Sequence, residues 1–201
     1  ALFGVPQPPQ HHPEVVTGIH VMMALRCAAA RGASVPVRFA VLVHDLGKAL
    51  TPAAHWPRHL GHEGAGLAPL DTLCARLRVP SEPRELATLA TRFHTHVHRA
   101  LELRPATVLE LLESADAFRR PERFDALLEA CECDARGRLG LEDRPYPQRE
   151  YLAAARAVAA AAALSADERA GLTGAAIGAA IRSRRLEALA AFKASRAGPA
   201  G

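Results

Sequence analysis

The amino-acid sequence predicts an all-α fold. Apolar residues make up 49% of the 201 residues but aromatic residues only 4%, and alanine and leucine are abundant. Alanine and leucine have high helix propensity. No segment alternates apolar and polar residues over a strand's length, which would be the main signature of a half-buried strand. The chain is long enough to bury a full core, so we expect one helical domain, 1–147, with a helical extension, 148–201, packed on it.

Proline and glycine divide the chain into the expected helices. The first helix ends at Gly32 and the second at Gly47, whereas Pro105 and Pro121 each begin a helix. Ser81 is expected to cap the fourth helix, because acidic residues follow in its first turn. The predicted helices cover 14–31, 37–47, 62–77, a fourth starting near 81, 105–118, 121–136, 148–163 and 174–195, and the last is expected to fray into the tail 197–201.

Charge and composition limit the classes of function. The net charge of +4 is mild and the charges are interspersed, which permits a nucleic-acid or phosphate partner without requiring one. The alanine-rich stretch 153–163 is interrupted by Arg156 and is too weakly apolar to span a membrane, and no signal peptide is evident. Because the sequence begins at Ala1 rather than methionine, we expect a piece of a longer protein. The cysteines lack zinc-finger spacing and are interpreted as reduced thiols of a cytoplasmic protein: Cys27, Cys74, Cys131 and Cys133.

Several polar residues fall on the apolar faces of the predicted helices. His20 lies within the apolar face of the first helix, His94 within that of the fourth, and Asp116 on that of the fifth. The second helix is apolar on every side, which predicts that it is buried, and its last turn carries His44 and Asp45.

A buried histidine can simply be satisfied by hydrogen bonds, but a buried carboxylate costs several kcal/mol unless a cation or donors compensate. No lysine or arginine lies on the same apolar faces, so a divalent cation is the expected solution. Imidazole and carboxylate ligands suit Mn, Fe, Co, Ni or Zn, with Mg as an alternative. Adjacent helical side chains point about 100° apart. Gly47 would end the helix and let His44 and Asp45 both turn inward.

The order His20, His44-Asp45, His62, His94, Asp116 resembles the H…HD…H…H…D pattern of the HD superfamily of metal-dependent phosphohydrolases. Over about residues 1–195 the chain looks more specifically like the C-terminal half of bacterial tRNA nucleotidyltransferases, the multifunctional CCA-adding enzymes. The segments that carry this resemblance are ALFGVPQP at 1–8, HPEVVTGIH at 12–20, RFAVLVHDLGKALTP at 38–52, WPRHLGHEGAG at 56–66, RLRVP at 76–80 and CECDARGRLG at 131–140.

The resemblance implies an HD-type helical bundle and a metal-dependent phosphohydrolase: a 2′,3′-cyclic phosphodiesterase, 2′-nucleotidase and phosphatase joined to repair of tRNA 3′ ends. It implies nickel or magnesium, with manganese or cobalt as further options, and a tRNA 3′ end or a 2′,3′-cyclic or 2′-phosphate as substrate. A homodimer is one option for assembly, and a membrane partner is not expected. The paired carboxylates of the family's N-terminal head are absent, so nothing here could add CCA by itself. The implied metal ligands are His20, His44, Asp45 and Asp116.

The remaining roles leave alternatives open. His62 and His94 would contact the phosphate or help to hold a second ion, unless they are ordinary hydrogen-bonded histidines. Lys48 would neutralise phosphoryl oxygens, unless it is a solvated surface lysine. In segment 132–138 the arginines could bind phosphate, or Asp134 could pair with Arg138 at i, i+4. The arginines that could contact tRNA are Arg58, Arg119, Arg120 and Arg123. The remaining histidines of the fourth helix, His96 and His98, are expected to be exposed.

Two rival functions are considered. One is hydrolysis of nucleotides or alarmones by an HD enzyme, which the sequence disfavours because residues 46–48 are Leu-Gly-Lys and the acidic pair of alarmone hydrolases is missing. The other is a non-catalytic module for tRNA binding or dimerisation.

Overall fold

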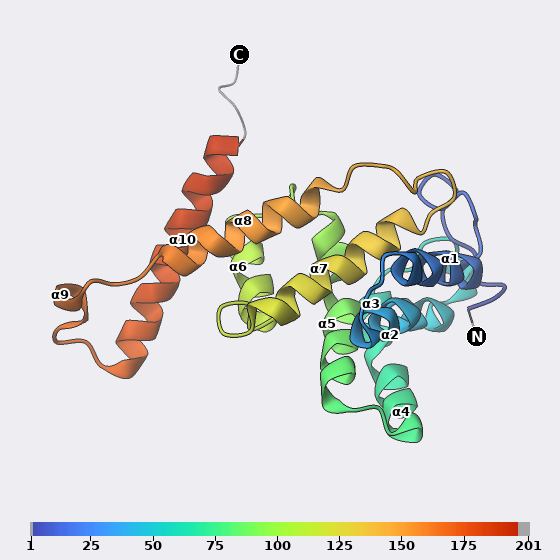
Figure 1. Cartoon of the computed structure of the whole chain (residues 1–201), viewed down its shortest axis with the longest axis horizontal. Helices are drawn as coiled ribbons and strands as arrows, with labels where there is room; N and C mark the ends of the chain where they lie inside the picture. The colour runs from blue at the N-terminus through green and yellow to red at the C-terminus, as the bar shows by residue number, and fades with distance from the viewer. Residues whose placement is uncertain (1, 197–201) are drawn as a thin grey trace, which may run out of the picture. The chain divides into compact units, whose positions relative to one another are not determined.

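The computed structural model describes residues 2–196, and in this range the only β pairing is an isolated antiparallel bridge between Pro6 and Val16. The all-α class predicted from the sequence is therefore confirmed. The predicted tail 197–201 lies outside the described residues. Along the chain the helices are α1 (Thr17–Ala30), α2 (Val35–Val43), the 3-10 helices η1 (Leu46–Leu50) and η2 (Ala53–His55), α3 (His62–Ala65), α4 (Leu67–Leu77), α5 (Ser81–His98), α6 (Pro105–Ser114), α7 (Pro121–Arg136), α8 (Pro147–Ala161), α9 (Ala166–Arg169) and α10 (Gly174–Arg196) (Figure 1).

Three predicted helices end or break earlier than expected. The second α-helix stops at Val43 and continues as the 3-10 helix η1, and the third is divided at Gly66 into α3 and α4. The fifth, α6, stops at Ser114 rather than Phe118, because Asp116 adopts a left-handed conformation with φ of 53°. A non-glycine residue in that region ends helical geometry.

The chain divides into two compact units, the first comprising 1–98 and 125–149. In this unit α2 packs against α1 and α5 (Figure 1), and its buried side chains include Val37, Ala40 and Val41. Gly137, just after α7, approaches α1 so closely that a Cβ there would lie 2.3 Å from the Ala24 Cα. This close approach brings the end of α7 against α1.

The N-terminal segment 2–16 of the first unit lies alongside the start of α1. The Thr17 hydroxyl donates a hydrogen bond to the Val5 carbonyl at 2.9 Å, and the backbone amide of Gln7 donates to the Val15 carbonyl at 2.6 Å. These bonds hold an irregular segment whose polar side chains reach the site described below.

The second unit comprises 99–124 and 150–201, and it differs from the predicted division by grouping residues 99–124 with the C-terminal helices. Here α6 packs against α10, and Leu109, Leu112 and Leu189 are buried. The Lys193 ammonium donates to the Leu103 carbonyl at 2.6 Å. Among the described residues, no helix combines the length and the apolar character that crossing a membrane requires.

Candidate metal centre

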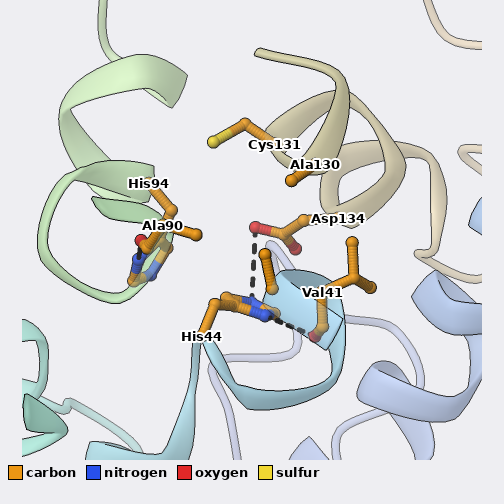
Figure 2. A pocket seen from close by; sticks show the side chains of 8 residues that line it. Val41, His44, Ala90, His94, Ala130, Cys131 and Asp134 are labelled. Atoms are coloured by element: carbon orange, nitrogen blue, oxygen red, sulfur yellow. Dashed lines mark hydrogen bonds and ion pairs between the residues drawn. The ribbon is translucent and has the colours of Figure 1, made fainter. Parts of the chain in front are cut away.

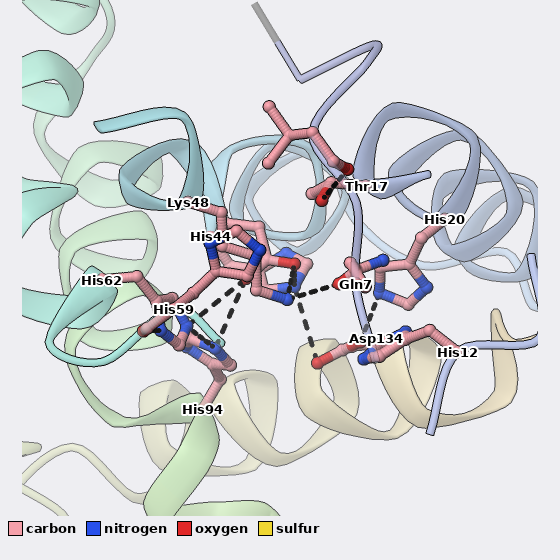
Figure 3. Close-up of polar contacts among 12 residues, drawn as sticks. Gln7, His12, Thr17, His20, His44, Lys48, His59, His62, His94 and Asp134 are labelled. Carbon is pink, nitrogen blue, oxygen red and sulfur yellow. Dashed lines mark hydrogen bonds and ion pairs between the residues drawn. The ribbon is translucent and has the colours of Figure 1, made fainter. Parts of the chain in front are cut away.

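Polar side chains from five helices and one turn of the first unit meet in a buried cluster (Figure 3). None of these residues is more than 9% exposed. The cluster contains five of the predicted site histidines and acids, the predicted lysine and one further acid: His20 from α1, His44 and Asp45 directly after α2, Lys48 from η1, His62 from α3, His94 from α5, and Asp134 from α7.

Gly47 determines the geometry of the turn that carries His44 and Asp45. Asp45 has φ of −99° and ψ of 9°, outside helical geometry, so the backbone leaves the α-helix at this pair as expected. A Cβ at Gly47 would lie 1.9 Å from the His62 carbonyl oxygen. Only glycine lets α3 approach η1 this closely, and the approach brings His62 beside Asp45.

Three imidazoles present the same ring nitrogen to the centre. Each Nδ1 lies at hydrogen-bond distance from a backbone carbonyl, and a carbonyl only accepts, so Nδ1 carries a hydrogen and, in the neutral form of each ring, Nε2 carries a lone pair. The Nε2 atoms of His62 and His94 lie 3.1 Å apart, so two lone pairs face each other when both rings are neutral. This arrangement favours a shared cation. The three Nδ1 contacts are His44 with Val41 O at 2.9 Å, His62 with His59 O at 2.7 Å, and His94 with Ala90 O at 3.0 Å.

The two carboxylate oxygens of Asp45 face different residues of the cluster. Its Oδ2 accepts a hydrogen bond from the Lys48 ammonium at 2.8 Å and lies 3.3 Å from His44 Nε2. Its Oδ1 has no hydrogen-bond partner and lies 3.6 Å from Nε2 of both His62 and His94. A buried carboxylate oxygen without a donor is costly unless a cation binds it.

Asp134 supplies the second carboxylate. Its Oδ1 accepts from His20 Nε2 at 2.8 Å, and its Oδ2 accepts from His98 Nε2 at 2.5 Å and lies 3.5 Å from His44 Nε2. Arg138, the alternative partner considered from the sequence, is more distant at 3.9 Å. Asp134 is therefore a member of the histidine cluster, a role that the sequence analysis did not assign to it.

Asp116 is placed differently from the prediction. It follows the end of α6 in the second unit, and its carboxylate accepts two hydrogen bonds from Arg119, at 2.8 and 3.2 Å. Among the described residues, none of the groups of histidines and acids that could hold a metal ion includes Asp116. The predicted position on an apolar face assumed a helix reaching Phe118, which the left-handed Asp116 ends earlier.

The expected exposure of His96 and His98 was wrong, and one of the two alternatives for Lys48 is excluded. His98 is not exposed but bonds to Asp134 and to the Tyr146 hydroxyl, and His96 is half-buried. Lys48 is not a surface lysine: it is 8% exposed and also donates to Gln7 at 2.5 Å. It therefore neutralises part of the buried negative charge, for which no lysine or arginine was expected.

The pKa values in the cluster follow from burial and from these contacts. Burial alone would raise the pKa of Asp45, but the charges of His44 and Lys48 hold that pKa well below its usual value. Burial opposes protonation of His20, yet the hydrogen bond to Asp134 and the nearby carboxylate of Glu14 raise its pKa to about 9. Burial, assisted by the charge on His44, keeps the pKa of His94 well below its usual value. Binding of a divalent ion would therefore displace protons from imidazoles.

The residues present fit a divalent metal ion. Two overlapping groups place ligand atoms within 4.8 Å of one another, His20–His44–Asp134 and His44–Asp45–His94. His44 Nε2 and Asp45 Oδ1 both lack hydrogen-bond partners. Mixed imidazole and carboxylate donors suit first-row transition metals. Figure 2 shows His44, His94 and Asp134 lining a small pocket with apolar residues that include Val41 and Cys131.

The fold and the site together define a helical protein with a buried candidate centre for a divalent metal. Its sequence is 53% identical to the multifunctional CCA protein of Thioalkalivibrio sulfidiphilus over 98% of this chain, and 53% identical to that of Pseudomonas aeruginosa over 98%. The corresponding protein of Pseudomonas syringae is 51% identical over 97% of the chain. The chain spans 48% of the length of each of these relatives, so it is homologous to about half of a multifunctional CCA protein.

No protein-family model and no solved structure matches the chain.

Proposed function

We propose that this chain is a metal-dependent phosphohydrolase domain of the HD type, and that it forms part of a CCA-adding tRNA nucleotidyltransferase. The observation that carries the proposal is the convergence of imidazole Nε2 atoms on two buried carboxylates, with His44 Nε2 and Asp45 Oδ1 lacking other partners. The similarity to proteins named for CCA supports tRNA as the RNA partner.

The proposed ligands of the principal ion are His20, His44, Asp45 and Asp134. Three of them are the ligands expected from the sequence, and Asp134 takes the place of Asp116. The position of Asp134 supports this assignment because its carboxylate lies next to two of the other proposed ligands. Its Oδ2 lies 3.5 Å from His44 Nε2, and its Oδ1 accepts a hydrogen bond from His20 Nε2.

His62 and His94 would bind a second cation together with Asp45 Oδ1. Their facing Nε2 lone pairs, 3.1 Å apart, and the unpartnered Asp45 oxygen support this position. A bound divalent ion would polarise a phosphoryl oxygen and lower the pKa of a water bound to it. Lys48 would hold Asp45 in place and contribute positive charge beside the phosphoryl group.

The proposed substrates carry a single ribose-borne phosphate, as a 2′,3′-cyclic or 2′-phosphate. Lys48 is the one lysine in the cluster, and the sequence contains no glycine-rich phosphate loop. A triphosphate usually needs several cationic or amide contacts along its length. One phosphoryl group therefore suits this site better than a nucleoside triphosphate or an alarmone.

The test is metal analysis of the purified chain, followed by kcat/KM for 2′,3′-cAMP, 2′-AMP, ATP and an alarmone with added Ni²⁺, Mg²⁺, Mn²⁺ or Co²⁺. We expect the cyclic nucleotide and the 2′-nucleotide to be preferred. A preference for ATP or the alarmone would move the chain to the rival class of HD hydrolases. Absence of hydrolysis with every metal would favour a non-catalytic module for tRNA binding or dimerisation.

A further inference from the structure

His20 lies between two carboxylates, one on each side of its ring. Its Nε2 contacts Asp134 at 2.8 Å, and its Nδ1 lies 3.1 Å from Oε1 of Glu14. The side chain of His20 is fully buried and that of Glu14 is 2% exposed, so water does not compete for these positions. His20 thus has one nitrogen toward the proposed metal centre and the other toward a buried acid.

Glu14 is itself held from three sides. Its Oε1 also accepts a hydrogen bond from His12 Nδ1 at 2.9 Å, because a carboxylate can only accept. Its Oε2 accepts from the backbone amide of Leu139 at 3.3 Å. The rings of His12 and His20 meet edge to face with their centroids 4.7 Å apart, and Figure 3 shows both residues near Asp134.

The backbone beside Glu14 is strained. Val15 has φ of 59°, a left-handed conformation that a β-branched residue rarely adopts. Hydrogen bonds hold Val15 in this conformation: its backbone amide donates to the His12 carbonyl, and its carbonyl accepts from the backbone amide of Gln7. Strain of this kind persists where the surrounding structure requires a particular side-chain position.

A metal-ligating imidazole keeps one hydrogen, and its affinity for the ion depends on the acceptor of that hydrogen. If His20 ligates through Nε2, Nδ1 must carry the hydrogen, and Glu14 Oε1 is the carboxylate within reach. In this structure the contact has the distance but not the angle of a hydrogen bond, and such bonds often become well aligned only when the site is occupied.

We propose that Glu14 is a positioning residue for the metal ligand His20, and that His12 and the Leu139 amide hold Glu14 in that role. This inference rests on the metal site of the proposed function. The alternative, a separate ion bound by His12, Glu14 and His20, would require His20 to give both ring nitrogens to metals and so to lose both hydrogens.

The experiment measures the metal affinity and stoichiometry of the chain by chelator competition at neutral pH, using Co²⁺ so that the absorption spectrum also reports ligand geometry. Glu14→Gln is expected to weaken the tightest site about 10- to 100-fold and to change the Co²⁺ spectrum. His12→Ala should shift affinity in the same direction by less. At saturating metal, kcat should fall with little change in KM.

Glu132→Gln is the matched control. Glu132 is another buried carboxylate of the first unit, but it bonds to Arg136 and Arg149 and to none of the proposed ligands. Its variant should lose stability and keep the wild-type metal affinity. Urea unfolding of the metal-free variants separates a general loss of stability from a loss of metal binding.

Three outcomes would overturn the inference. If wild type binds Co²⁺ and Glu14→Gln binds it equally well, Glu14 has no positioning role and the proposed function stands. If Glu14→Gln loses a whole equivalent of Co²⁺ while the remaining affinity is unchanged, the three residues form a separate ion site. If wild type binds no metal at all, the proposed function fails and this inference fails with it.

Discussion

Replacing Asp134 by Asn tests which acid completes the proposed metal site. The carboxylate of Asp134 accepts from His20 and from His98, and the amide of Asn would keep one acceptor while presenting a donor to the other histidine. Loss of one charge-assisted hydrogen bond in a buried site, with a donor left unpaired, should destabilise the metal-free fold by about 2–4 kcal/mol. The remaining free energy of unfolding can be measured with urea.

The effect on metal binding should be larger in relative terms. Substitutions behind a ligand typically cost 10- to 100-fold in affinity, so loss of a ligand itself should raise the Kd more than about 100-fold, or ~2.7 kcal/mol. Asp116→Asn is the control. Asn tolerates the left-handed conformation at this position, and the Asp116 side chain is 25% exposed beside Arg119. We expect its metal affinity to equal that of wild type.

The assay is chelator competition on both variants and wild type under identical conditions. The reasoning is refuted if Asp116→Asn loses metal binding while Asp134→Asn retains it, because Asp116 would then be the ligand that the sequence predicted.

Three further predictions concern the same unit. His44→Ala should abolish metal-dependent phosphohydrolysis while circular dichroism remains helical, since one ligand contributes more to the site than to the helices; full activity would remove His44 from the site. Gly47→Ala should destabilise the chain by about 1–3 kcal/mol and reduce hydrolysis, because the new Cβ would overlap the His62 carbonyl oxygen. An unchanged urea midpoint would contradict the close approach of α3 to η1. Burial alone would raise the pKa of Glu132, but hydrogen bonds from Arg149 and Arg136 lower it. The stability that the Glu132 carboxylate contributes is therefore present above its pKa in the unfolded chain and is lost as the pH falls through its lower folded-state pKa. When urea unfolding is compared at pH 5 and pH 3, Glu132→Gln should lose less stability than wild type. Equal losses would exclude a contribution of Glu132 to the pH dependence of stability.

The sequence predicted the helical class and most of the clustered side chains because polar residues on apolar helical faces are visible in a single chain. The same reasoning, applied to α7, would also have found Asp134. It follows Leu127, Ala130 and Cys131 at helical spacing, and all three are buried. The same sequence also offers Arg138 at i, i+4 as a partner for Asp134, and this pairing is an alternative explanation for the carboxylate.

Other parts of the site could not be predicted in this way. Gln7, His12 and Glu14 come from an irregular segment without periodicity, so their burial depends on tertiary hydrogen bonds such as that from Thr17 to Val5. The placement of Asp116 away from the expected apolar helix face arises from a single left-handed residue, whose conformation no propensity of the preceding helix indicates. Lys48 was recognised, but its burial required knowledge of the turn after Gly47.

The first unit is interrupted in sequence, and this affects when its centre can form during synthesis. His20 and Asp134 are in direct contact but are separated by 114 positions along the chain. At about 5–20 residues per second, a ribosome needs roughly 6–23 seconds after adding the histidine to add the aspartate. Until then a nascent chain holds imidazoles without their second carboxylate, so the proposed ligand set can be assembled only after the intervening segment of the other unit has been made.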